Sequence, residues 1–262
     1  MRVWVASLIL YCSVYIICEL FRFLLGRKIL NVNEKYLPLV LEFIGTVQVC
    51  APMFDVNIVL QTYGIQGVVI EITFIELMNL VLLRDASADP CPFIIGFIKK
   101  QVSAQKLFAF VGIQFLAAYL SYVFVLGFWK LGMHPKHSEF LHEDCESDLS
   151  VTMLFGSLVE AGGLIANKLA EVYLEGKIVT QRILQFAIAL VAALVTVLGI
   201  FYTGMYANPI VAWACTFNCG GVPHLDHFVV YWISPIVAHL AIEKIISHGH
   251  AEAKLDASKK TE

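Results

Sequence analysis

Long apolar segments constrain this chain more than any other feature of its sequence. A helix that crosses a bilayer needs roughly 20 apolar residues. Seven segments of about that length occur, at residues 3–25, 38–60, 64–83, 105–131, 151–174, 182–203 and 228–247. Of the 262 residues, 59% are hydrophobic and only 15% are charged, whereas soluble domains are nearer half apolar and a quarter charged. The segments predict an all-α, multi-pass membrane protein embedded in a lipid bilayer.

Lys and Arg residues indicate how these segments are oriented, because they concentrate in cytosolic loops. They cluster after the first segment, around 84–106, between the fifth and sixth segments and in the carboxyl-terminal tail. We assign those regions to the cytosol and the acidic loop 132–150 to the opposite side. The amino terminus is then noncytosolic if segment 3–25 spans the bilayer. Glu19 and Arg22 near its end leave partial, interfacial insertion as the alternative.

Two shorter apolar stretches each follow a polar residue and a proline. Residues 93–98 follow Asp89-Pro90-Cys91, and residues 210–217, which begin with Ile210, follow Asn208-Pro209. Neither stretch is long enough to cross a bilayer, and each has the length of a re-entrant segment. Asp and Asn are favoured helix caps, and proline is favoured at the first helical position. Each stretch is therefore predicted to be a short helix that begins inside the membrane.

The two halves of the chain show a repeat. Glu42 lies 47 residues before Asp89, and Glu160 lies 48 residues before Asn208. Each half holds three long segments, and because three is odd the second half enters the membrane upside down. The sequence thus predicts an inverted repeat of six spans, two re-entrant half-helices and an extra amino-terminal apolar helix.

A helix that starts at mid-membrane is tolerated only where it is buried in protein or lines water. Two such helices meeting at their amino ends would bring positive dipole ends together beside a narrow water path. That arrangement repels cations. A half-bilayer corresponds to about ten helical residues, which fits 209–219. We expect Glu42 and Glu160 to accept hydrogen bonds from the loops ahead of the short helices, as structural support.

These residues resemble the aquaporin, or major intrinsic protein, family. The resemblance covers about 39–247 and includes "EFIGT" at 42–46, "YTG" at 202–204 and "YWISP" at 231–235. The divergent proline boxes, the additional first segment and the position of Cys219 are similar to the superaquaporin, or unorthodox, subfamily. The resemblance implies an amino-terminal helix and basic linker (1–36), a channel domain (37–247, halves 37–131 and 151–247) and a cytosolic tail (248–262).

The chain departs from the family at both boxes. Asp89 stands where the family has Asn in the first box, and Ile210 stands where it has Ala in the second. Asp lacks the amide donor that the family presents to water, and its charge would offset the positive helix ends that exclude cations. Three explanations stay open. Asp89 is protonated, or a neighbour such as Arg84 neutralises it, or the barrier to cations is weakened.

The resemblance also implies the residues of the narrow filter. Val211 occupies the position of the family's filter Arg, Thr196 that of the frequent His, and Met205 and Val69 the remaining two. Such a filter is apolar, with fewer donors to orient water. We expect it to be wide enough for a small neutral solute such as glycerol or hydrogen peroxide.

The seven cysteines lack the paired spacing of a zinc site or a disulfide framework, so most are expected to be small buried side chains. Loop 134–148 contains three His residues, Cys145 and several carboxylates, which offers a metal site in principle. We interpret it as a solvated acidic loop and expect neither a metal site nor a cofactor. Cys145 and Cys219 fall on the same side and could pair, but packing of Cys219 is the favoured interpretation.

The sequence predicts a passive channel for water and small neutral solutes. It is not expected to be an enzyme, because no nucleophile accompanies its histidines, nor to bind nucleic acid, because no basic stretch carries aromatic residues. The rival hypothesis is a nonconducting membrane protein that keeps the fold for structural or partner-binding reasons. The family implies a homotetramer. Lys259 and Lys260 resemble a retrieval signal for the endoplasmic reticulum; another intracellular membrane or the plasma membrane is the alternative.

Overall fold

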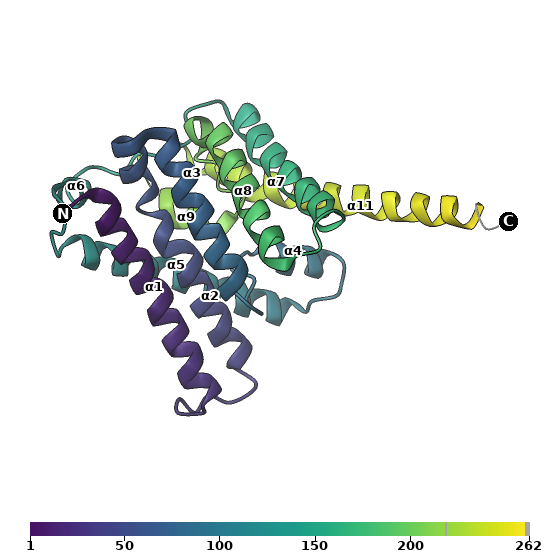
Figure 1. Cartoon of the computed structure of the whole chain (residues 1–262), viewed down its shortest axis with the longest axis horizontal. Coiled ribbons are helices and arrows are strands. Elements are labelled where there is room, and N and C mark those ends of the chain that lie inside the picture. Colours follow the sequence, from purple (N-terminus) through teal and green to yellow (C-terminus); the bar gives the residue numbers. More distant parts are fainter. Residues whose placement is uncertain (218, 260–262) are drawn as a thin grey trace.

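The computed structural model describes residues 1–217 and 219–259, with side chains described up to Ser247. Its regular structure in these ranges is helical (Figure 1). The elements are α1 (Val3–Gly26), α2 (Leu37–Met53), α3 (Val56–Leu82), α4 (Cys91–Ile98), α5 (Ala104–Trp129), α6 (Pro135–Phe140), α7 (Met153–Glu175), α8 (Gln181–Thr203), α9 (Pro209–Thr216), α10 (His224–Phe228), the π-helix η1 (Val229–Ile233) and α11 (Ser234–Lys259).

The helices pack as two related halves. In the first half α2 lies against α5, and in the second half α7 lies against α11, while α3 and α8 join the two halves. Each short helix packs partly on the opposite half, because α4 contacts α11 and α9 contacts α2 and α5. In Figure 1, α9 accordingly lies inside the bundle. This is the predicted inverted arrangement, with half-helices embedded between full-length ones.

The lengths of the helices differ from those of the seven predicted segments. Among the described residues, five helices are long and apolar enough to cross a membrane: Val3–Gly26, Val56–Leu82, Ala104–Trp129, Gln181–Thr203 and His224–Ser247. Helix α2 has only 17 residues, and α7 carries Glu160, Lys168 and Glu171. Both are buried partly by other helices rather than by lipid alone, so strict apolarity is not required of them.

The break between α2 and α3 comes earlier than the apolar pattern indicates. Helix α2 ends at Met53, directly after Pro52, and α3 begins at Val56. Asp55 in this turn is fully buried, and its carboxylate accepts a hydrogen bond of 2.8 Å from Trp129 Nε1 on α5. Gly64 then kinks α3 with φ of +65°, a conformation that glycine adopts without steric cost. The break expected between segments 38–60 and 64–83 therefore lies at residues 54–55, and the residues after it are helical.

Helix α1 packs along α2 and α3 through both apolar and polar contacts. Tyr11 hydrogen-bonds to the carboxylate of Glu71 on α3, and Tyr15 Oη donates to the carbonyl of Ile75 at 3.3 Å. Arg22, at the other end of α1, donates to Gln48 Oε1 on α2 at 2.6 Å. These contacts fix the rotation of α1 about its axis, because an apolar helix alone packs against its neighbours with little rotational preference.

The last span is continuous from α10 through η1 into α11. The π-helix η1 overlaps the start of the "YWISP" stretch, where Tyr231 Oη donates to the carbonyl of Thr203 at 2.7 Å. Helix α11 then extends well out of the bundle, where residues from 248 had been assigned to a tail (Figure 1). Of the two tail lysines, Lys259 ends this helix without a described side chain, and Lys260 lies outside the described residues.

Candidate functional site

The amino ends of the two short helices meet. Asn208 Nδ2 donates to the backbone carbonyl of Ala88 at 2.8 Å, although 120 residues separate them. Asn208 Oδ1 also caps its own helix by accepting from Ile210 N at 3.0 Å. On the other side Asp89 Oδ1 accepts from Cys91 N at 2.8 Å. Helix α4 begins at Cys91, one residue later than predicted, with Pro90 as its capping residue.

The backbone before each short helix turns in the same unusual way. Ala88 has φ of +50° and Ala207 has φ of +51°, values that are uncommon for residues other than glycine. Each of these alanines lies immediately before the polar residue of its box. Such strained backbone persists only where surrounding contacts hold it in place.

In the first half Glu42 holds this strained backbone. Its carboxylate is 2% exposed and accepts hydrogen bonds from Ser87 N at 2.9 Å and Ala88 N at 2.8 Å. Gln114 Nε2 on α5 donates to the same carboxylate at 2.7 Å. A buried acidic group is costly unless it is hydrogen-bonded, so these three donors account for its presence.

In the second half Glu160 makes the equivalent contacts. Its fully buried carboxylate accepts from Tyr206 N at 3.2 Å and Ala207 N at 2.7 Å. Thr203 Oγ1 supplies the third donor at 2.6 Å, where the first half uses Gln114. The repeat seen in the spacing of the acidic residues is therefore also a repeat of hydrogen bonds.

The side chain next to Asp89 is a histidine, and not the arginine that the sequence suggested. Its second carboxylate oxygen, Oδ2, lies 3.7 Å from His239 Nε2 on α11. Arg84, by contrast, forms an ion pair with Glu19 on α1, so it is not the partner of Asp89. His239 could not be predicted as this neighbour, because it lies inside the last span with no motif around it. Its position beside Asp89 depends on the packing of α4 against α11.

The predicted filter residues do not all face one space. Thr196 lines a small cavity of about 20 Å³ together with Tyr206, Asn57 and Asp148. A cavity of that size has room for about one water molecule. Val211 is 3% exposed and packs in a core cluster with Ile210 and Cys50.

Met205 and Val69 lie elsewhere. The side chain of Met205 is buried between α7 and α8, where a methyl group added to Gly163 would lie 1.6 Å from its Cε atom. Its sulfur is 2.7 Å from the position of a methyl group added to Gly199. Val69 is partly buried against the large apolar cluster around α3. Met205 therefore fills the space that two glycines leave at a helix interface.

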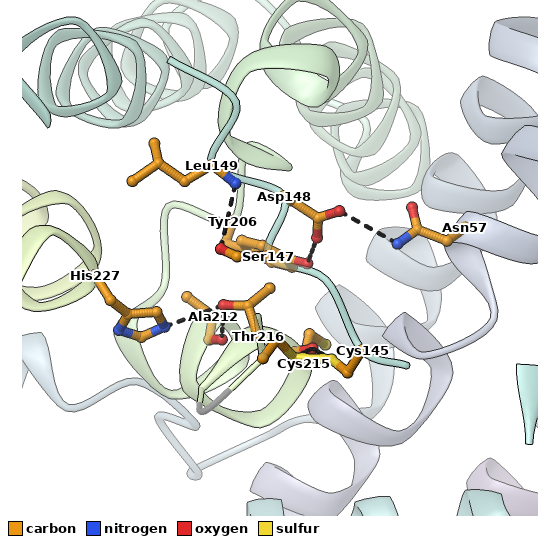
Figure 2. The surroundings of a disulfide bond; sticks show 11 residues. Asn57, Cys145, Ser147, Asp148, Leu149, Tyr206, Ala212, Cys215, Thr216 and His227 are labelled. Atoms are coloured by element: carbon orange, nitrogen blue, oxygen red, sulfur yellow. Dashed lines mark hydrogen bonds between the residues drawn. A yellow bond between two sulfur atoms is a disulfide. The ribbon is translucent and has the colours of Figure 1, made fainter. Parts of the chain in front are cut away.

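A disulfide closes the loop over this end of the bundle (Figure 2). Cys145 bonds to Cys219, so the interpretation of Cys219 as a packed free thiol was wrong. The loop is also held by backbone hydrogen bonds from Gly220 N to the Cys145 carbonyl at 2.8 Å and from Ser147 N to the Gly220 carbonyl at 3.0 Å. Helix α9 ends at Thr216, earlier than the predicted 219, because the chain turns here to reach Cys145.

The loop that the disulfide closes places Asp148 in the wall of the small cavity. Its carboxylate accepts hydrogen bonds from Tyr206 Oη and, at 3.3 Å, from Asn57 Nδ2 (Figure 2). Gly204, with φ of +76°, ends α8 and has Tyr206 and Asp148 against it. This group of side chains was not predicted from the sequence. A signal existed in the tyrosine that follows "YTG" by two residues, but its partners come from distant segments.

The histidines of the loop make local contacts. His134 Nδ1 accepts from Lys136 N at 3.1 Å and caps α6, and His142 Nδ1 lies 2.7 Å from the Ser138 carbonyl. His137 is fully buried and stacks on Trp129. The loop is thus better ordered than a solvated acidic segment, and its histidines point to different partners rather than to one ion.

Comparison with known proteins identifies relatives over most of the chain. No protein-family model matches. The chain is 28% identical over 223 residues to Aquaporin-11 of Milnesium tardigradum, covering 82% of this chain and 80% of that protein. It is 23% identical over 252 residues to Aquaporin-12 of Mus musculus, covering 93% and 85%. It is 25% identical over 205 residues to Aquaporin-11 of Homo sapiens, covering 75% and 72%.

Proposed function

Because this chain belongs to the aquaporin family, with relatives in its superaquaporin-like branch, we propose that it forms a passive channel for water and small neutral solutes. The relatives are channels rather than enzymes. One observation carries the proposal: Asn208 of one half-helix hydrogen-bonds to the Ala88 carbonyl ahead of the other. A water path beside this contact would account for two helices that begin inside the bilayer.

The electrostatics of the contact support neutral permeants. Each helix amino end carries a partial charge of roughly +0.5, so two facing ends oppose a passing cation. In aquaporin-type channels these helix ends contribute to the exclusion of cations. Glu42 and Glu160 stabilise the backbone that orients the short helices, and each carboxylate accepts three hydrogen bonds. We assign Asp89, Pro90, Cys91, Asn208, Pro209 and Ile210 to the waist of the channel.

The second narrow region lies at the small cavity under the disulfide-closed loop. Thr196 contributes a hydroxyl there, and Tyr206 and Asp148 add polar groups that sequence reasoning had not assigned. Val211 stands where the family has its filter Arg and is buried beside Ile210, so this position adds no cationic barrier. We therefore propose glycerol and hydrogen peroxide as permeants besides water, with permeation controlled by Thr196 and Tyr206 more than by Met205.

Stopped-flow light scattering on proteoliposomes tests the proposal. We expect water permeability above that of empty vesicles of the same lipid, together with faster glycerol entry. Faster water flux without faster glycerol entry would eliminate the wide filter but keep the channel. If water, glycerol and peroxide all cross at the rate of empty vesicles, the nonconducting rival is correct.

Three further properties follow from the family. We propose that residues 37–247 form the channel domain, with 1–36 as an added helix and linker and 248–262 as a cytosolic tail. We propose a homotetramer with one pore in each subunit. We also propose residence in the endoplasmic reticulum through Lys259 and Lys260, with the plasma membrane as the alternative. Cross-linking in native membranes and localisation of a Lys259→Ser, Lys260→Ser variant test the last two.

A further inference from the structure

A group of metal-ligating side chains lies at the waist. Asp89, Cys91 and His239 each offer one ligand atom, and these atoms all lie within 4.8 Å of one another. Two of the residues come from the start of α4 and the third from α11, which packs against it. The ion pair of Lys99 with Glu243 ties the same two helices together one turn further along α11.

The geometry fits a bridging ion better than a direct contact. Asp89 Oδ2 and His239 Nε2 are 3.7 Å apart, which is too long for a hydrogen bond. Zinc bonds of about 2.0–2.2 Å to nitrogen and oxygen place two tetrahedral ligands roughly 3.4 Å apart. The other oxygen of Asp89 accepts a hydrogen bond from Cys91 N at 2.8 Å, and this contact holds the carboxylate with Oδ2 on the side of His239. Small movements would close the site.

The chemistry of the three groups selects a borderline or soft divalent ion. Carboxylate oxygen, imidazole nitrogen and thiolate sulfur are the ligands of zinc sites. The Asp89 carboxylate and a Cys91 thiolate would together cancel a charge of +2. This matters because the facing helix ends otherwise disfavour a cation. Binding displaces the thiol proton of Cys91, which leaves as the metal–sulfur bond forms.

We propose that Asp89, Cys91 and His239 form a Zn²⁺ site at the waist, with a fourth position open to water. The proposal departs from the expectation that the chain has no metal site. It also gives the Asp of the first box a role that Asn could not fill, because an amide supplies no charge to the ion. Resting on the proposed function, it further implies that bound Zn²⁺ closes the water path.

Direct binding tests the site without reference to flux. Isothermal titration of the purified, detergent-solubilised protein with Zn²⁺, and ultraviolet absorption of cadmium–thiolate bonds with Cd²⁺, report the affinity and the thiol ligand. We expect Cys91→Ser, His239→Gln and Asp89→Asn each to lower Zn²⁺ affinity by at least about tenfold. Only Cys91→Ser should abolish the cadmium–thiolate band.

Two variants serve as controls. Cys12→Ser removes an exposed thiol on α1, and His142→Gln removes an exposed loop histidine. Both should bind Zn²⁺ as the wild type does. The site is disproved if the wild type binds no Zn²⁺, or if His239→Gln and Cys91→Ser bind as tightly as the wild type.

Flux measurements separate the site from the channel. Zn²⁺ should slow water permeation through wild-type proteoliposomes and leave His239→Gln proteoliposomes unaffected. Binding without conduction would overturn the channel proposal and keep the site. Conduction without Zn²⁺ binding would overturn the metal site and keep the channel proposal.

Discussion

At the scale of single residues, Asp89 is the departure with the clearest electrical consequence. A charge about 4 Å from a cation changes its energy by about 4 kcal/mol at an effective dielectric constant near 20. We predict that Asp89→Asn leaves water flux equal or higher and reduces sodium leak by at least about tenfold. Proteoliposomes report both quantities. Asp85→Asn, an exposed carboxylate in the same loop, should change neither. A leak that is unchanged in Asp89→Asn contradicts this role.

Met205 allows a second test at the same scale, because a packing role and a filter role of its side chain predict different outcomes. Its side chain fills the space over Gly163 and Gly199. We predict that Met205→Ala lowers stability by about 2–5 kcal/mol and leaves glycerol entry unchanged. Thermal unfolding in detergent measures the first and stopped-flow the second, with Leu198→Ala, exposed on α8, as the control. If Met205→Ala admits glycerol faster and is as stable as the wild type, Met205 is a filter residue.

At the scale of helices and loops, Gly45 determines how closely α2 approaches the loop before α4. A methyl group added there would lie 2.4 Å from the Ala86 side chain, one residue before the backbone that Glu42 holds. We predict that Gly45→Ala costs about 1–3 kcal/mol and slows water flux. Gly112→Ala is the matched control, because nothing lies within 4 Å of its added methyl group on α5. Equal stability and equal water flux in the two variants would show that α2 does not approach the loop before α4 closely.

The disulfide makes its own prediction at this scale. It joins Cys145 to Cys219, which are 74 positions apart in the sequence, and bridges of that kind typically contribute about 2–5 kcal/mol. Cys145→Ser and Cys219→Ser should lower thermal stability by the same amount, and so should the double variant. If the double variant is much less stable than either single one, the two sulfurs act independently and the bridge is absent.

The sequence predicted which helices form better than it predicted where they end and which side chains contact one another. Apolar length and proline caps are local signals, so the long helices and both short ones were found from them. The end of α2 depends on the buried turn at Asp55, and the end of α9 depends on the bond to Cys145; neither has a local signature. The contacts of His239 and Asp148 could not be predicted for the same reason, because packing between distant segments determines their partners.

At the scale of the whole molecule, the inverted repeat accounts for most of what is observed. Glu42 and Glu160 hold equivalent backbone, Ala88 and Ala207 adopt equivalent strain, and each half contributes one short helix to the centre. The halves differ where the chain has diverged, with Asp89 facing His239 on one side and Asn208 reaching Ala88 on the other. These differences make the meeting point of the two short helices chemically asymmetric, with a carboxyl group beside a histidine on one side and an amide on the other.

The osmotic water permeability of wild-type proteoliposomes, measured over a range of temperatures, tests this view of the molecule most directly. A continuous water path between the two helix ends predicts permeability that rises in proportion to protein content, with an activation energy below that of the lipid alone. Permeability and activation energy equal to those of empty vesicles would mean that the two helices meet without enclosing water.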